Sequence, residues 1–287
     1  MKPRLHVLLS HDGHTGVVLR RGPSSQVAAI GWNRDTDTFT LGQWLKGRIY
    51  ERRSDLSPDG KHMIYFAMNG HWSSRAKGAW TAISIAPYLT AIALYAKGDC
   101  WHGGGWFVDK THFWLNDGYG HTELESTTRV KRSPTPPPYA QGYGGECPGV
   151  YFNRLVRDGW TLRTDLSDRK YDVFEIPLAH GWILRKLART QSGAPPGKGV
   201  YFDEHELVHP ASGRELPRDT WEWASPDAGR VVWAEGGCLW AGKITKASAA
   251  AEDPLTSVKM LHDFAPMKFE GIVAPYAEKK ATAKKRR

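Results

Sequence analysis

The chain has 287 residues, of which 40% are hydrophobic and 11% aromatic, and it contains 13 tryptophans. This supply of apolar side chains is enough to bury a sizeable core, although the length exceeds that of a usual single domain. The formal net charge is +9, but residues 279–287 contribute six positive charges, so the rest of the chain is nearly neutral. A nearly neutral body argues against a nucleic-acid partner, and the basic end predicts only non-specific contacts with nucleic acid.

No run of eighteen apolar residues is present, and the apolar stretch near Met1 is too short for a secretory signal. We therefore expect a monomeric cytoplasmic protein with no membrane partner. Three cysteines, Cys100, Cys147 and Cys238, lie far apart without a CxxC pair, which favours free thiols over a disulfide framework. Residues 277–287 are small and basic and predict a disordered tail.

Residues 54–69 predict a strand, a tight turn and a second strand. In the turn at 57–60, Pro58 presets φ at the second position and Gly60 takes a positive φ. The β-branched and aromatic residues at 64–66 then suit a pleated sheet. The pattern of a turn aspartate followed by an apolar run recurs along the chain, which indicates a repeat architecture.

Five turn aspartates mark the copies of this hairpin. They are Asp12, Asp59, Asp109, Asp158 and Asp227, separated by 47, 50, 49 and 69 residues. The long last interval holds a predicted insertion at about 191–216, with a hairpin at 201–216 that turns at 210–213. A unit of about 45 to 50 residues with about four short strands is typical of a propeller blade. The sequence therefore predicts an all-β fold, a single five-bladed β-propeller over residues 1–276, with another all-β sandwich or barrel as the alternative.

Short apolar runs between the copies supply the other strands. They comprise residues 17–19, 27–32, 38–45, 80–85, 89–96, 160–162, 171–178, 182–187 and 238–244. The fourth copy, at 147–162, is expected to be a hairpin, and the proline-rich residues 130–139 an exposed loop. Because a ring must be closed, we expect residues 258–264 or 269–273 to pair with strands of residues 5–32.

Two of the copies resemble a known repeat. Ser-Pro-Asp-Gly at 57–60 before Ile-Tyr-Phe-Ala at 64–67, and Ser-Pro-Asp at 225–227 before Val-Val-Trp-Ala at 231–234, are similar to the WD40-like propeller repeats of TolB-type proteins. The resemblance covers these two units closely and the other three loosely, because the proline is absent from three turns. The resemblance implies a propeller fold and a binding function, and it does not imply a catalytic activity.

Residues 205–209, His-Glu-Leu-Val-His, match the HExxH pattern in which two histidines one helical turn apart bind zinc. The pattern needs a helix, but Pro210 follows directly and pushes His209 out of the α region. We therefore interpret the segment as a solvent-facing hairpin strand and expect no metal.

Residues 98–106 combine a carboxylate, a thiol and an imidazole with three glycines and two tryptophans. Glycines permit close approach by a ligand, and aromatic rings can stack on one. In a propeller this segment would lie beside the central channel. The predicted ligand-binding residues are Asp99, Cys100, His102 and Trp106; the alternative is a bend between blades with the tryptophans in the core.

No catalytic motif of the sequence stands in the local structure that its chemistry would need. We therefore expect a binding module that recognises a protein or small-molecule ligand at the propeller face and central channel, without a cofactor. The alternative is a hydrolase or lyase at the channel mouth near Asp99, Cys100 and His102. That alternative requires His102 to lie within hydrogen-bond distance of a carboxylate or a second histidine.

Overall fold

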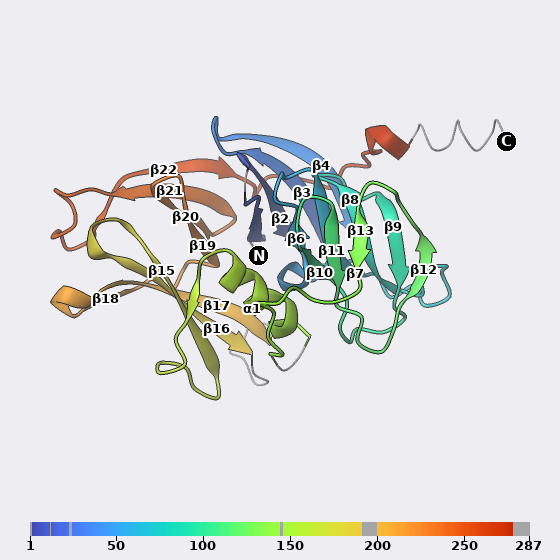
Figure 1. The fold of residues 1–287 in the computed structure, drawn as a ribbon. Coiled ribbons are helices and arrows are strands. Elements are labelled where there is room, and N and C mark those ends of the chain that lie inside the picture. Colours follow the sequence, from blue (N-terminus) through green and yellow to red (C-terminus); the bar gives the residue numbers. More distant parts are fainter. Residues whose placement is uncertain (1, 12, 23–24, 144–145, 191–199, 278–287) are drawn as a thin grey trace. The chain divides into compact units, whose positions relative to one another are not determined.

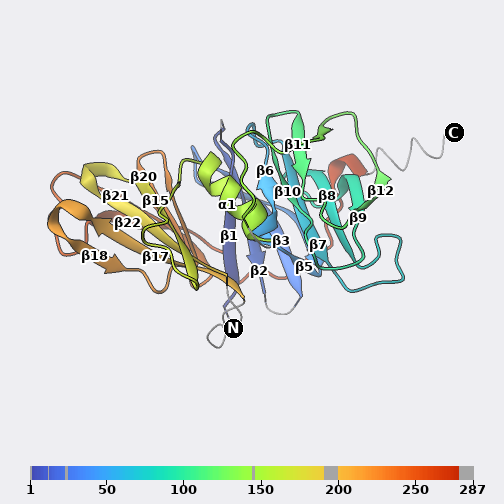
Figure 2. The same cartoon turned by 60° about the horizontal axis from the view of Figure 1, so that its bottom comes forward.

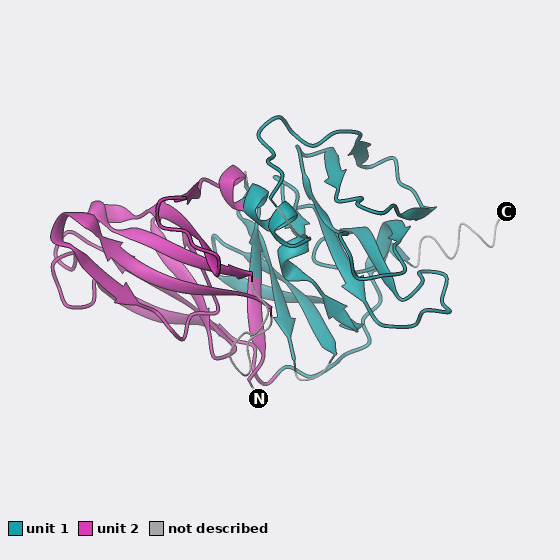
Figure 3. Ribbon diagram, turned by 90° about the horizontal axis from the view of Figure 1, so that it is seen from below, with its two compact units in different colours: residues 1, 7–154, 267–287 teal, residues 2–6, 155–266 magenta. Residues whose placement is uncertain are grey.

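A computed structural model describes residues 2–11, 13–22, 25–143, 146–190 and 200–277. Three predictions concern other residues and lie outside this described part: Asp12 in the first turn, the segment at 191–199, and the basic tail from 278 onward. The described chain folds into five β-sheets, which confirms the all-β prediction (Figure 1). It divides into two compact units, coloured in Figure 3: residues 1, 7–154 and 267–287 form unit 1, and residues 2–6 and 155–266 form unit 2.

Unit 1 contains the first three sheets, except for residues 4–6 of the first strand, which belong to unit 2. The first has the order β1 (Arg4–Leu9), β2 (Thr15–Arg21), β3 (Gln26–Asn33), β4 (Thr38–Lys46). The second has the order β12 (Thr122–Glu125), β9 (Ala91–Ala96), β8 (Ala79–Ile85), β7 (His62–Met68), β5 (Arg48–Ile49), and β6 (Asp55–Leu56) also pairs with β7. The third has the order β10 (Gly105–Phe107), β11 (His112–Leu115), β13 (Lys131–Ser133).

Unit 2 contains the other two sheets. The fourth sheet has the order β14 (Thr161–Leu162), β15 (Tyr171–Pro177), β16 (Ile183–Thr190), β17 (Tyr201–His209), β18 (Arg214–Pro217). The fifth has the order β19 (Trp223–Asp227), β20 (Arg230–Glu235), β21 (Cys238–Ile244), β22 (Leu255–Asp263). Four short helices occur along the whole described chain, in both units. They are η1 (Glu51–Arg53), α1 (Pro148–Arg157), η2 (Ala179–Gly181) and η3 (Pro210–Ser212).

The hairpin predicted at 54–69 is confirmed by the pairing of β6 with β7. Its turn is held by the Ser57 hydroxyl, which donates to the Asp59 carboxylate at 2.8 Å, and by the Gly60 N–H, which donates to the Ser57 carbonyl at 2.8 Å. Gly60 has φ of 70°, as the turn type requires. Pairing of β1 with β2, β10 with β11, and β19 with β20 confirms three further copies.

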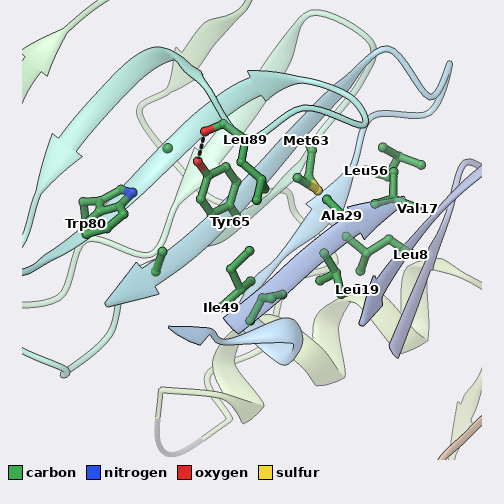
Figure 4. Close-up of a cluster of buried hydrophobic side chains, with 13 residues drawn as sticks. Leu8, Val17, Leu19, Ala29, Ile49, Leu56, Met63, Tyr65, Trp80 and Leu89 are labelled. Carbon is green, nitrogen blue, oxygen red and sulfur yellow. Dashed lines mark hydrogen bonds between the residues drawn. The ribbon is translucent and has the colours of Figure 1, made fainter. Parts of the chain in front are cut away.

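The second sheet is buried on both faces. Along β7, Met63 and Tyr65 pack in a cluster with residues of the first sheet (Figure 4). Ile64 packs with residues of the third sheet. Successive side chains of a strand point to opposite faces, so a continuously apolar strand can fill two cores at once. In agreement, β10 of the third sheet lies beside β6 and β7 (Figures 1 and 2). The Tyr65 hydroxyl donates to the Leu89 carbonyl within the first cluster.

The fourth predicted hairpin is wrong, because residues 148–157 form the helix α1. Pro148 suits the first position of a helix, where its missing N–H is not needed. All residues from 150 to 155 are buried, so the helix is enclosed on more than one face. The Asp-Gly pair at 158–159 that suggested a hairpin turn instead follows the last helical residue, and backbone bonds from residues 159 and 160 back to 156 and 155 close the helix end.

Two other segments differ in detail from the predictions. The expected loop at 130–139 contains β13, which pairs in parallel with β11; a strand at a sheet edge tolerates nearby prolines. The hairpin expected at 201–216 forms and turns at η3, where Gly213 adopts φ of 65°. Its first strand, β17, is an interior strand of the fourth sheet and pairs with β16 over eight residues.

The prediction that strands from both chain ends pair in one closing sheet is wrong. Residues 255–263 form β22, which pairs with β21, and the described part of the first sheet contains only strands from residues 4–46. Residues 267–277 return to unit 1 without forming a strand, which is consistent with the prolines at 266 and 275. They contact β4 through side chains: Gln43 Nε2 donates to the Ile272 carbonyl at 2.8 Å, and Phe269 lies 5.9 Å from Trp44.

Candidate functional site

The segment predicted to bind a ligand forms the loop 97–104, which connects β9 to β10 in unit 1. At its start, the N–H groups of Lys97 and Gly98 donate to the carbonyl of Ala79 at 2.9 and 3.3 Å. At its end, the N–H of Gly103 donates to the carbonyl of Asn116 at 2.9 Å. Both ends of the loop are therefore fixed by backbone hydrogen bonds to segments that flank the sheets.

Arg53, the last residue of η1, anchors the middle of the loop. Its side chain is almost fully buried, and its Nη1 donates to the carbonyl oxygens of Cys100, at 2.7 Å, and of His102. Its Nε donates to Sγ of Cys147 at 3.2 Å. One guanidinium thus joins the loop to the segment before α1, because its five N–H donors form a rigid fork.

The surroundings of Arg53 complete this anchor. Its guanidinium lies over the rings of Tyr50 and Phe66, at 4.8 and 5.2 Å from their centroids. Burial raises the pKa of the Tyr50 hydroxyl, although the nearby arginines act in the opposite direction. Burial also raises the pKa of the Cys147 thiol. A buried thiol with a raised pKa is a poor nucleophile, so Cys147 acts as a packing and hydrogen-bonding residue.

Two of the loop glycines are required by the protein's own packing. A Cβ atom on Gly104 would lie 1.9 Å from the carbonyl oxygen of Arg53, and a Cβ atom on Gly103 would lie 2.4 Å from the ring of Phe66. Their φ angles are +73° and +82°, which side-chain-bearing residues rarely adopt. The space beside these two glycines is therefore filled by the core of unit 1, as in the alternative interpretation of a glycine-permitted bend.

The four predicted ligand-binding residues have different environments. The Asp99 carboxylate pairs with Lys97 Nζ at 3.1 Å and accepts the Trp101 N–H at 2.9 Å. Cys100 is exposed. Trp106 is only 1% exposed and packs against Trp114 with ring centroids 4.3 Å apart, which is the environment that the alternative interpretation expects. The indole belongs to the core because all three residues of β10 are buried and this strand contacts β6 and β7.

His102 does not meet the condition set for an enzyme. Its Nδ1 lies 3.4 Å from Oδ1 of Asn116, and its ring contacts that of Tyr119 at a centroid distance of 5.2 Å. The Asp99 carboxylate bonds to other groups within its own loop. The structure therefore brings Asp99, Cys100 and His102 onto one loop without joining them as an acid–base pair.

Three exposed aromatic side chains lie on or near this loop, and of these only Trp101 was considered in the sequence analysis, as one of the two tryptophans of residues 98–106. They are Trp72, Trp101 and Tyr119, with 54%, 58% and 85% of their surface exposed. We call them the aromatic edge. Their loops lie at one end of the second sheet, since β7 ends at 68, β8 begins at 79, β9 ends at 96 and β12 begins at 122.

Contacts between these loops hold the aromatic edge together. Trp72 packs against Gly78, and Lys77 packs against Gly98 of the anchored loop. Lys97 Nζ lies 5.9 Å from the centroid of the Tyr119 ring. Large aromatic side chains that stay exposed on fixed loops are typical of recognition surfaces, because burying them on binding costs little conformational entropy.

The HExxH pattern at 205–209 lies in strand β17 and not in a helix, which excludes the helical zinc site. The expectation that this strand faces solvent is wrong for His205, which is 1% exposed. Its Nδ1 lies 3.1 Å from the Trp221 carbonyl and its Nε2 lies 3.2 Å from Nζ of Lys186, so both ring nitrogens have partners. Lys186 also pairs with Asp203 at 3.4 Å. The described residues contain no group of three or more potential metal ligands.

No protein-family model matches the sequence, and no curated protein is similar to it. In the part of the chain that the structure describes, every helix is too short or too polar to cross a lipid bilayer. The candidate site therefore rests on the geometry of the anchored loop and the aromatic edge.

Proposed function

We propose that the protein is a binding module built as one five-bladed β-propeller, with the five sheets as its blades. The order of the strands supports this, because each sheet is built from strands that are close together in the chain. The second sheet also packs against a neighbour on each face, as a blade in a ring does.

The proposed recognition surface is the aromatic edge together with the anchored loop 97–104. The observation that carries the proposal is that three large aromatic side chains remain more than half exposed on loops fixed by internal contacts. Tryptophan and tyrosine are the residues most enriched among the energetic hot spots of protein interfaces. Lys97 and Asp99 pair with each other beside these rings, so the surface has little net charge. We therefore expect a folded protein partner rather than a polyanion.

The test is affinity capture from extracts of the native host with three forms of the protein. The recognition variant carries Trp101→Ser and Tyr119→Ser. The control variant carries Val258→Ser and Met260→Ser, which removes two side chains about half exposed on β22. Because all four side chains are exposed, we expect both variants to melt within a few degrees of the wild type.

The account predicts that a partner captured by the wild type and by the control variant is lost with the recognition variant. Truncation of one hot-spot residue costs about 2 kcal/mol or more, which is about thirtyfold in Kd. A partner retained by the recognition variant, or lost equally with the control, would place the binding surface elsewhere. Turnover by the purified protein that is abolished by His102→Ala would instead support the hydrolase or lyase.

A further inference from the structure

A cavity of about 330 Å³ lies in unit 1, at the other end of the second sheet from the aromatic edge. It is bordered by the start of β2, the end of β3, the start of β4, the turn at Gly60 and the segment 86–88 after β8. This position follows from strand direction, because the turn at Gly60 precedes β7 and the anchored loop follows β9. The cavity is therefore separate from the proposed recognition surface.

The wall formed by residues 86–88 is held rigidly against the first sheet. Pro87 packs onto two glycines: a Cβ atom on Gly42 would lie 2.2 Å from the Pro87 carbonyl oxygen, and one on Gly31 would lie 3.1 Å from Pro87 Cγ. Gln43 Oε1 accepts the N–H groups of Leu89 and Thr90, both at 2.8 Å. A cavity with fixed walls is already formed before a ligand arrives, which lowers the entropic cost of binding.

The lining is polar but uncharged. Among the described residues that line the cavity, none is acidic or basic. Hydroxyl groups come from Thr15, Thr38, Thr40 and Tyr88, and an amide comes from Asn33. Apolar surface comes from Ala86 and Pro87, whereas Trp32 is only 1% exposed and contributes almost none. The Thr38 and Thr36 hydroxyls form a hydrogen bond at 2.9 Å.

We propose that this cavity binds a neutral, polyhydroxylated ring compound of the saccharide class. A charged ligand would find no counter-charge among the described lining residues, so the hydration that it loses there would not be compensated. A purely apolar ligand would leave the hydroxyl groups of the walls without partners. A sugar ring offers hydroxyl groups around its rim and an apolar C–H face, and thus matches both parts of the lining. The volume lies at the lower end of the usual range for ligand sites, so it suits one or two rings.

The test is saturation-transfer NMR with a panel of D-glucose, D-galactose, N-acetyl-D-glucosamine, D-ribose and maltose, with glucose 6-phosphate as the charged probe. Thr40→Trp places a bulky side chain at the cavity from an exposed position of β4, where an aromatic residue suits a strand. Thr161→Trp is the matched control, because Thr161 is also an exposed strand threonine but lies in unit 2.

We expect at least one neutral sugar to receive saturation from the wild type and from Thr161→Trp, and to lose it with Thr40→Trp. Glucose 6-phosphate should bind at least about tenfold more weakly than glucose, because its charge has no partner in the cavity. The proposal is overturned if no neutral sugar of the panel binds, if binding survives Thr40→Trp, or if the phosphate ester binds as well as glucose. These outcomes are independent of the capture experiment, which concerns the opposite end of the sheet.

Discussion

Arg53 contributes more to the candidate site than any of the residues expected to bind a ligand. Its guanidinium satisfies two carbonyl oxygens of the anchored loop and the Cys147 sulfur at once. A lysine at this position would keep the charge but would lack the forked donors, and would leave buried acceptors without partners. We predict that Arg53→Lys lowers the free energy of unfolding by about 3 kcal/mol in urea denaturation.

Arg75 provides the matched control for Arg53. It also donates to a backbone carbonyl, that of Leu124 at 2.7 Å, and pairs with Glu125 at 3.2 Å, but its side chain is 64% exposed. Arg75→Lys should therefore change stability by less than about 1 kcal/mol. Equal effects of the two substitutions would show that burial of Arg53 has no energetic importance.

His62 predicts a dependence of stability on pH. His62 is the first residue of β7 and follows the turn at 57–60 closely. Burial lowers the pKa of its imidazole, although Asp59 acts in the opposite direction. Because the folded-state pKa lies below the unfolded value of about 6.5, protonation favours unfolding. The stability that the neutral imidazole of His62 allows is fully present above a pH of about 6.5. This part of the free energy of unfolding is lost as the pH falls through the folded-state pKa.

The measurement is chemical denaturation of the wild type and of His62→Gln over a pH series. The stability difference between the two should shift in favour of the variant as the pH is lowered below about 6.5. A difference that is constant with pH, or that moves in favour of the wild type on acidification, would contradict the lowered pKa.

At the scale of elements, the anchored loop predicts a sharp difference between two glycines with similar φ. Gly104 has φ of 73° and no room for a Cβ atom beside Arg53, whereas Gly120 has φ of 76° and nothing within 4 Å of such an atom. Gly120→Ala should cost about 1 kcal/mol, the conformational penalty alone. Gly104→Ala should cost more than about 3 kcal/mol, because backbone must also move. Similar thermal shifts for the two variants would argue against the close approach.

The elements that could be predicted from the sequence are those specified by local turn chemistry. The turn at 57–60 and three of its four copies form hairpins, because the hydrogen bonds of such turns join residues only a few positions apart. Helix α1 was missed because an Asp-Gly pair suits a helix end as well as a hairpin turn, and only Pro148 at its start distinguishes the two. The loop at 98–106 was found from its glycines and aromatic residues. Its anchor was not, because Arg53 is 47 residues from Cys100 and 94 from Cys147.

At the scale of the whole molecule, the account depends on whether the five sheets belong to one ring. Each unit by itself shows sheets joined to neighbours: the cluster of Figure 4 joins the first and second sheets. In unit 2, Arg218 at the end of the fourth sheet forms a two-pronged ion pair with Asp253, just before β22. In the part of the chain that the structure describes, the closing strand pair expected from both chain ends is not formed. A closed ring would therefore be held together by side-chain packing between complete sheets.

Small-angle X-ray scattering tests this central claim most directly, since it reports how the two units are arranged in solution. A single compact propeller of this length predicts a radius of gyration of about 19 Å, from the size scaling of compact domains. A concentration-independent value close to that figure would support one ring. A radius several ångströms larger, with the two-lobed distance distribution of separate units, would contradict it.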